Sequence, residues 1–400
     1  MINALLLENP HADADPILEG AGIAVQRHPG ALSESDLIDA LDGVQVLGIR
    51  SKTRVTQKVL DAHPQLEAIG AFCIGTTQID LKTAAQRGIA VFNAPFSNTR
   101  SVVELAIGEI VALQRRLTER DRALHEGRWE KSAAGAHEVR GRTLGIVGYG
   151  NIGTQLSVLA EAMGMRVVFY DIGERLALGN AKRMRSMTEL LKTADIVSLH
   201  VDDRASNRGL FGEREFALMR PGAIFLNLSR GFVVDTAALR GAILSGHLSG
   251  AAVDVFPEEP NANGEAFMSD LRGLPNVILT PHIGGSTLEA QYSIGQFVGT
   301  KLANYVTGAS TDMSVTMPAL VLPRTEGAVQ RIAYVHRNTP GVLARINRGL
   351  AEYGTNIVGQ ILGTSGEIGY MVTDISNELP AEVVDALARM EDTIRLRILR

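Results

Sequence analysis

Three polar residues that could move a proton and bind an acid each follow an apolar run in the second half of the chain. Arg230 follows AIFLNLS, Glu259 follows VDVFPE, and His282 follows NVILTP. An imidazole is a common general base, a carboxylate beside it raises its pKa, and a guanidinium suits a carboxylate ligand. Alone, each residue is also typical of a surface ion pair, a loop acid or a structural histidine. Together, they predict hydride transfer from a 2-hydroxy acid, with His282 as the base, Glu259 as its partner and Arg230 as the substrate cation.

A glycine-rich turn before these residues predicts a dinucleotide site. Gly148, Gly150 and Gly153 follow the apolar run 144–147 and precede a helical run, and the next apolar run ends at Asp171. In this order the glycines permit a tight turn, close approach of a pyrophosphate and close helix packing, while the acid binds the adenosine ribose. Because a carboxylate repels a 2′-phosphate, we expect NAD as the cofactor. The alternative is a structural turn followed by a surface aspartate.

The elements that must position these residues alternate strand and helix. The first hundred residues, and again those from 141 to 285, read as repeated βα units, which form parallel sheets. A single helix over about 101–126 bridges the two sets, and a helix over 286–308 returns to the first. We therefore expect an α/β fold with two Rossmann-like, doubly wound domains: a discontinuous substrate-binding domain, 1–98 and 286–308, and a nucleotide-binding domain, 99–285.

The last quarter of the chain differs in kind. Residues 309–328 are polar with two prolines and predict a linker, and 329–400 read as βαββαβ, a small split-βαβ sandwich of the α+β class. In this segment we expect a helix with Thr339 as N-cap, Pro340 at its first position and Gly354 at its end.

Composition excludes several classes of partner. The net charge of −5 argues against nucleic acid, and no run of residues is apolar enough to span a bilayer. Cys73 is the single cysteine, so no internal disulfide or cysteine metal cluster can form, which fits a reducing compartment. We expect a cytoplasmic protein with no metal site.

The motifs LGIVGYGNIG, LNLSRG, AAVDVFPEEP and LTPHIGGST resemble those of the D-isomer-specific 2-hydroxyacid dehydrogenases. The likeness extends over nearly the whole chain. It implies that Arg230, Glu259 and His282 are catalytic. It also implies a set of NAD contacts at the glycine turn, after the second strand and around the catalytic residues: Gly148, Gly150, Asn151, Ile152, Gly153, Asp171, Leu228, Ser229, Arg230, Asp254, His282, Ile283, Gly284 and Gly285.

IRSKT, GAFCIGT and FNAPFSNTRSV add a resemblance to the branch of this family that oxidises 3-phosphoglycerate to 3-phosphohydroxypyruvate, the entry to serine synthesis. The implied substrate residues are Arg50, Ser51, Gly75 and Asn98, with Lys52 and Lys131 as phosphate cations. Solvated surface lysines are the alternative for the last two. The chain departs from the family at Asp202, where proline is usual, and at Leu228, where a small residue is common.

The C-terminal segment resembles the ACT domain, a module that pairs with a copy of itself and binds amino acids at the shared interface. The likeness places His336, Asn338 and Asn356 where L-serine binds and implies feedback inhibition in a homotetramer. A structural dimerisation domain without an effector is the alternative. Two other functions remain open: reduction of 2-oxoglutarate or use of another 2-hydroxy acid on the same site, and a non-catalytic NADH-sensing interaction protein.

Overall fold

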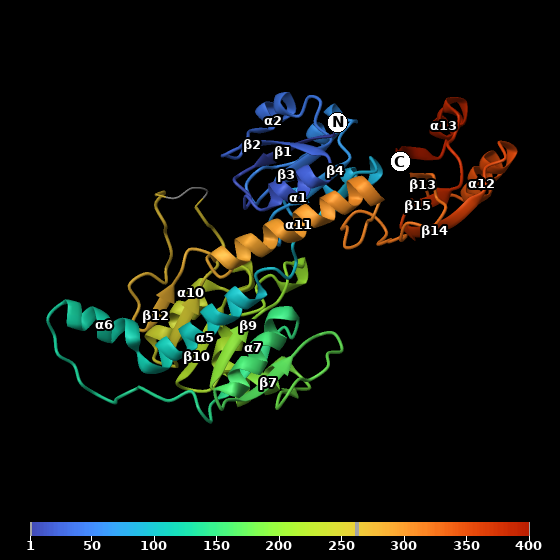
Figure 1. Cartoon of the computed structure of the whole chain (residues 1–400). Helices are drawn as coiled ribbons and strands as arrows, with labels where there is room; N and C mark the ends of the chain where they lie inside the picture. Colours follow the sequence, from blue (N-terminus) through green and yellow to red (C-terminus); the bar gives the residue numbers. More distant parts are fainter. Residues whose placement is uncertain (1, 261–263, 400) are drawn as a thin grey trace. The chain divides into compact units, whose positions relative to one another are not determined.

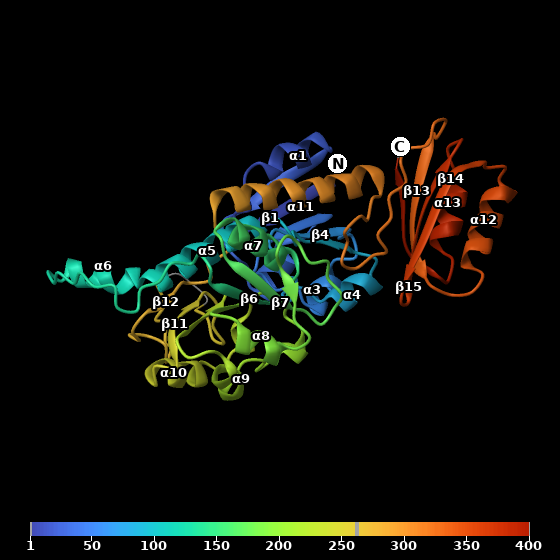
Figure 2. The same cartoon turned by 90° about the horizontal axis from the view of Figure 1, so that it is seen from below.

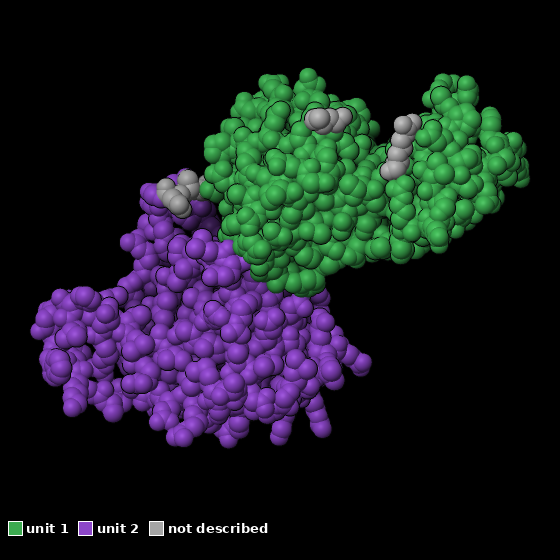
Figure 3. Space-filling model, viewed as in Figure 1, with its two compact units in different colours: residues 1–97, 291–400 green, residues 98–290 purple. Residues whose placement is uncertain are grey.

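The computed structural model describes residues 2–260 and 264–399, which form two compact units. The first contains Met1–Ser97 and Gln291–Arg400, and the second contains Asn98–Ala290 (Figure 3). Each unit has its own parallel sheet, and the first also carries a small antiparallel sheet. The expected fold class, two doubly wound domains with a βαββαβ domain, is confirmed.

The parallel sheet of the first unit has the strand order β2-β1-β3-β4-β5 (Figure 1). Its strands are β1 (Ile2–Leu7), β2 (Ile23–His28), β3 (Val46–Ile49), β4 (Ala68–Ala71) and β5 (Ala90–Phe92). Apolar side chains of α2 (Glu34–Ala40), α3 (Gln57–Ala62) and α4 (Leu81–Gln86) cover one face, and those of α1 (Ala14–Gly20) and α11 (Leu288–Gly308) cover the other. The order reverses between β1 and β3, and ligands of such sheets bind at this switch point.

The second unit has a seven-stranded parallel sheet of order β12-β11-β10-β9-β6-β7-β8. Its strands are β6 (Thr143–Val147), β7 (Arg166–Tyr170), β8 (Lys182–Arg183), β9 (Ile196–Leu199), β10 (Ala223–Asn227), β11 (Leu248–Val253) and β12 (Val277–Leu279). One face packs against α5 (Thr99–Arg115) and α7 (Asn151–Ala162). The other packs against α8 (Met187–Thr193), α9 (Glu213–Leu218) and α10 (Thr236–Leu244). Its switch point lies between β6 and β9.

The bridging helix is interrupted, contrary to the expectation of one helix over 101–126. α5 ends at Arg115, and α6 (Leu117–His125) starts after Arg116, whose φ of 52° is left-handed. The amphipathic pattern was correct for α5, but it carries no sign of a left-handed residue, so the sequence did not reveal the break.

The C-terminal sheet has the antiparallel order β14-β15-β13-β16, with both helices on one face (Figure 2). Its elements are β13 (Gln330–Arg337), α12 (Val342–Glu352), β14 (Ile357–Ser365), β15 (Ile368–Ile375), α13 (Ala381–Ala388) and β16 (Thr393–Leu399). The expected N-cap was wrong: α12 begins at Val342 after Gly341 in a left-handed conformation, and the Thr339 hydroxyl donates to Asp392 instead. Gly354 does follow the end of this helix, as expected.

The other face of the C-terminal sheet packs against the parallel sheet of the same unit. Val335 and Tyr370 share a hydrophobic core with Phe92 and with Tyr305 of α11. The expected linker, 309–328, joins this packing. Val315 N donates to Val91 O, and Val91 N donates to the Thr316 hydroxyl, so the segment hydrogen-bonds along the edge strand β5.

Candidate active site

His282 and Glu259 lie in direct contact in the second unit. The Nδ1 atom of His282 is 2.8 Å from the Glu259 carboxylate, which also accepts from Phe256 N at 2.9 Å. Because Glu259 occupies Nδ1, the imidazole presents Nε2 to a ligand. His282 is half-exposed and has a φ of 54°, a conformation that costs a non-glycine residue about 1–3 kcal/mol and is frequent at functional sites.

The carboxylate of Asp254 holds the loop that carries His282. It accepts hydrogen bonds from the backbone N of Ile283 and of Gly284, both at 2.8 Å, and from the Thr280 hydroxyl at 2.7 Å. A Cβ on Gly284 would lie 2.9 Å from this carboxylate, so glycine is needed for the close approach. The sequence indicated Asp254 as a cofactor contact, and this positioning role was not foreseen.

Arg230 reaches the same region because Gly231 packs against the loop before Glu259. A Cβ at Gly231 would lie 2.0 Å from the carbonyl of Phe256. Asn227 fixes the turn, since its amide donates to Arg230 O and its carbonyl accepts from Ser229 N. Arg230 donates to Ser229 O through one Nη, which leaves the rest of the guanidinium for a ligand.

The three charged groups act on one another. The hydrogen bond to Glu259 raises the pKa of His282 against the opposing effects of burial and of Arg230. Burial works against the charge of Glu259, but hydrogen bonds from His282 and Phe256 N and the nearby Arg230 lower its pKa. The geometry is that of a general base with an anionic partner and an adjacent cation.

The glycine turn leaves room for a dinucleotide. Gly148 has a φ of 92°, and a Cβ there would lie 2.4 Å from His200 O, whereas a Cβ on Gly150 would meet no atom within 4 Å. Gly153 packs on the carbonyl of Gly148, because a Cβ at Gly153 would lie 2.3 Å from Gly148 O. Gly150 is the N-cap of α7, and no side chain caps this helix. The first amides of α7, which include those of Asn151 and Ile152, can therefore receive a phosphate, as the dinucleotide prediction requires.

Asp171 lies directly beside this turn. Its carboxylate accepts from Tyr149 N and from Gly173 N, each at 2.8 Å, and lies 3.5 Å from Arg175 Nε. A cavity of about 240 Å³ borders the turn and is lined by Gly150, Asn151 and Arg175. The residues fit a dinucleotide whose ribose lies near Asp171.

Arg50, Ser51 and Lys52 follow β3 in the first unit, and a buried acid organises them. Glu8, which directly follows β1, accepts hydrogen bonds from the backbone N of Arg50, Lys52 and Thr53 at 3.3, 3.0 and 2.8 Å. Glu8 was not predicted from the sequence. The available signal was an acid ending the first apolar run of a parallel sheet, next to its switch point.

Gly75 lies beside the Arg50 loop because Gln78 joins the two. The Gln78 amide donates to Arg50 O at 2.7 Å and to Gly75 O at 3.3 Å. Gln78 was also missed, since a single glutamine after a strand carries no distinctive pattern. The structure thus brings four of the expected substrate residues to one edge of this sheet.

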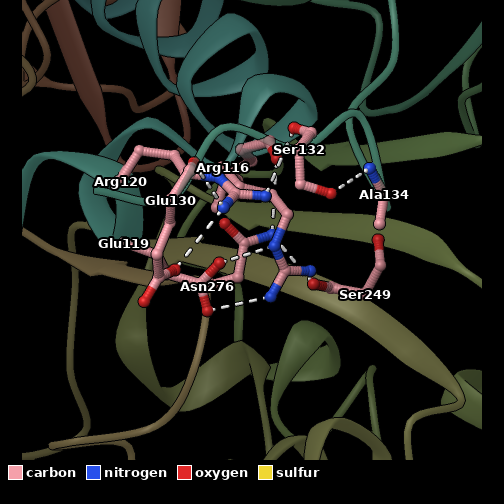
Figure 4. Close-up of polar contacts among 9 residues, drawn as sticks. Arg116, Glu119, Arg120, Glu130, Ser132, Ala134, Ser249 and Asn276 are labelled. Carbon is pink, nitrogen blue, oxygen red and sulfur yellow. Dashed lines mark hydrogen bonds and ion pairs between the residues drawn. The ribbon is translucent and has the colours of Figure 1, made fainter. Parts of the chain in front are cut away.

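Asn98 and Lys131 both belong to the second unit but lie far apart. Asn98 precedes α5 and packs on Gly285, next to the His282 loop. Lys131 follows α6, where Arg120 binds the carbonyls of Glu130 and Ser132 on either side of it (Figure 4). Since α5 spans about 25 Å, Lys131 and the His282 loop lie near opposite ends of this helix within one chain.

The predicted effector residues are separated within one chain. His336 pairs with Gly369 at one end of β15, whereas Asn356 precedes Ile357, which pairs with Ile375 at the other end, about 20 Å away. Asn338 is exposed next to His336. His336 itself is buried, and its Nε2 has no partner among the described residues.

The two departures from the family pattern have simple surroundings. Asp202 forms an exposed ion pair with Arg204, and Leu228 is buried among the core residues below the Arg230 turn. In the part of the chain that the structure describes, no cluster of His, Cys, Asp and Glu could hold a metal ion, and no helix is long and apolar enough to cross a membrane.

Comparisons with known proteins decide the family. Residues 107–284 match the NAD-binding domain of D-isomer specific 2-hydroxyacid dehydrogenases, and residues 332–395 match the AHAS small subunit-like ACT domain. The chain is 47% identical over 401 residues to D-3-phosphoglycerate dehydrogenase of Escherichia coli, covering 100% of this chain and 97% of that protein. The chain belongs to the D-3-phosphoglycerate dehydrogenase family.

Other members and structures agree. The Haemophilus influenzae D-3-phosphoglycerate dehydrogenase is also 47% identical, over 399 residues, with 100% of this chain and 97% of that protein covered. A crystal structure of D-lactate dehydrogenase from Aquifex aeolicus, complexed with NAD and lactic acid, matches with 26% identity and a TM-score of 0.68. That match covers 79% of this chain and 100% of the other. The chain is therefore a dehydrogenase with a nicotinamide cofactor and an ACT domain, as the motifs predicted.

Proposed function

We propose that this chain oxidises 3-phospho-D-glycerate to 3-phosphohydroxypyruvate with NAD, the first step of L-serine synthesis. The observation that carries the proposal is the 2.8 Å contact between His282 and Glu259, with Arg230 close enough to shift the pKa of both. The family, whose members are named for this substrate, supports the same reaction.

In this mechanism His282 and Arg230 contact the reacting part of the substrate. Nε2 of His282 accepts the proton of the substrate hydroxyl, and the Glu259 carboxylate stabilises the imidazolium that forms. Arg230 binds the substrate carboxylate and polarises the reacting oxygen. The bound nicotinamide supplies the acceptor for the hydride that leaves C2. Arg50, Ser51, Lys52, Gly75 and Asn98 are proposed to bind the remainder of the substrate, with Lys52 facing the phosphate.

NAD is the proposed cofactor in preference to NADP. The Asp171 carboxylate beside the glycine turn would accept hydrogen bonds from a ribose hydroxyl and repel a 2′-phosphate. The further proposed contacts are Leu228, Ser229, Asp254 and the backbone of residues 282–285. Fluorescence titration of NADH and NADPH tests this. We expect Asp171→Asn to reduce the preference for NADH, and an unchanged preference would contradict it.

L-serine is the proposed effector, bound by His336, Asn338 and Asn356 in a cytoplasmic homotetramer. Since Asn356 lies at the other end of the sheet from His336, one serine molecule can contact both sets only if two ACT domains pair, with each contributing one end. The pairing thus explains why the module needs a second copy.

Steady-state assays test the reaction and its regulation together. We expect turnover of 3-phosphoglycerate with NAD, and inhibition by L-serine that is lost in Asn338→Ala and Asn356→Ala while turnover remains. Turnover of 2-oxoglutarate or another 2-hydroxy acid alone would reassign the substrate. Absence of turnover on any of these acids would leave only an NADH-sensing role.

A further inference from the structure

A large pocket in the first unit lies away from every residue assigned above to substrate or cofactor. It has a volume of about 810 Å³ and is bordered by Arg87 after α4, by Arg337 and Asn338 after β13, and by Arg395 in β16. This volume lies within the range of small-molecule sites, roughly 300–1,000 Å³. The pocket is therefore large enough for a metabolite.

Positive charge dominates the lining. Of the three arginines, Arg87 forms an ion pair with Asp61 at 2.6 Å through one nitrogen. Arg337 is exposed, and among the described residues its guanidinium has no hydrogen bond or ion pair. Glu367 is the acidic residue of the lining, and among the described residues its carboxylate has no hydrogen bond or ion pair either. The pocket thus carries a net positive charge.

Arg395 is held in this lining without a carboxylate in contact. Its Nη2 donates to the carbonyls of Pro64 and Arg87 at 3.1 and 3.2 Å, and its buried Nε has no partner among the described residues. The neighbouring acid, Glu67, is bound by Arg397 at 2.8 Å. Burial lowers the pKa of Arg395, and the like charge of Arg397 adds to this effect, because desolvation disfavours the charged guanidinium. An anion in the pocket would relieve this cost.

The pocket is separate from the proposed serine site, although Asn338 borders both. Successive residues of a strand point to opposite faces of the sheet. Ile332 and Tyr334 pack with the helices α12 and α13, so His336 shares their face, whereas Arg337 points with Val335 to the opposite face. A ligand at Arg337 and a ligand at His336 would therefore lie on opposite sides of the C-terminal sheet.

We propose that this pocket binds a small oxyanion of the phosphate or phosphate-monoester class, held by Arg337 and Arg395 with Arg87 at the rim. Planar guanidinium groups bind such oxygens in bidentate fashion, and several together favour a multiply charged ligand over a monocarboxylate. Because the walls come from both α4 and the ACT domain, the anion fixes the contact between them. The proposal does not depend on the dehydrogenase reaction.

Inorganic phosphate is the probe, titrated calorimetrically into the full chain without dinucleotide. We expect Arg337→Glu to weaken phosphate binding at this site at least tenfold. Arg348→Glu is the matched control, because Arg348 is an exposed arginine of α12 outside the pocket and the change in net charge is the same. Any phosphate bound by the substrate residues persists in both variants, so the difference between them reports the pocket alone. Equal binding by the two variants would overturn the proposal.

A labelling experiment gives an independent readout on the unmodified protein. Phenylglyoxal modifies accessible arginines, and mass spectrometry locates the products. We expect phosphate to protect Arg337 but not Arg348. Equal modification of Arg337 with and without phosphate would also overturn the proposal.

Discussion

The two parallel sheets of the molecule use their switch points in opposite ways. Between β6 and β9 of the second unit, Gly148 makes the tight turn, Gly150 leaves open space, and no side chain caps the first turn of α7. Between β1 and β3 of the first unit, the side chain of Glu8 occupies the equivalent position and accepts three backbone hydrogen bonds. One crevice has room for a ligand, and the other is closed by the protein's own carboxylate. The same topology can therefore hold the proposed cofactor site or support the loop of the proposed substrate residues, depending on the residue that follows the first strand.

Replacement of the proposed base, His282, should have the largest effect. We expect His282→Ala to reduce turnover by about 10²–10⁴-fold, because no other group accepts the hydroxyl proton, while the dissociation constant of NADH stays unchanged. Glu259→Gln should also shift the acidic limb of the rate of oxidation to lower pH. The base must be neutral to act, and Glu259 raises the pKa of His282. A limb that stays in place would show that Glu259 does not act through His282.

Alanine at two glycines separates the stability of the open crevice from its ligand binding. Gly148→Ala should destabilise the fold by about 2–3 kcal/mol, because of the left-handed φ and the contact with His200 O. Gly150→Ala should leave stability unchanged but weaken NADH binding at least tenfold, since its methyl group enters space needed by the pyrophosphate. Denaturant unfolding and NADH titration measure both. Normal binding by Gly150→Ala would contradict the assignment of the turn.

The third prediction concerns removal of the Glu8 carboxylate from the switch point of the first unit. Glu8→Ala leaves three amides without their acceptor and should cost about 2–3 kcal/mol of stability, since water replaces only part of the lost bonding. Because these amides shape the loop of Arg50 and Lys52, the KM for the acid should rise while NADH binding remains. A rise in the NADH dissociation constant instead would contradict the division of roles between the units.

A second buried acid, Glu109, should make the stability of the fold depend on pH. Glu109 in α5 is buried, and within residues 2–260 and 264–399 neither of its carboxylate oxygens has a hydrogen-bond partner, in contrast to Glu8. Burial, aided by repulsion from Asp254, raises the pKa of Glu109 to about 8. The folded chain keeps this proton where the unfolded chain loses it, so stability falls as pH rises from about 4.5 to about 8. Between about pH 6 and about pH 9 the free energy of unfolding of the wild type should fall by about 2 kcal/mol more than that of Glu109→Gln. If the free energy of unfolding depended on pH in the same way in the wild type and in Glu109→Gln, Glu109 would be ionised in the folded chain.

The sequence predicted the elements that follow simple periodicity and the site residues that belong to motifs. The βα rhythm, the Gly148 turn and the His282 and Glu259 pair all come from residues near one another in sequence or within one sheet edge. Glu8, Gln78 and Gly231 were missed as positioning residues, because their roles depend on contacts between loops distant in sequence. The break at Arg116 and the start of α12 depend on single left-handed residues that periodicity does not report.

The strap formed by residues 311–320 has a consequence for how this enzyme could change over evolution. It hydrogen-bonds along the edge strand β5 of the N-terminal sheet, and the ACT domain packs on a hydrophobic core that it shares with this sheet and with α11. Loss of the C-terminal residues by a premature stop codon would expose both, producing a chain prone to aggregate rather than an unregulated enzyme. Release from the proposed feedback inhibition is therefore more accessible through point substitutions than through truncation. Exchange of the ACT domain for a foreign one would require new residues where the domain packs on the N-terminal sheet.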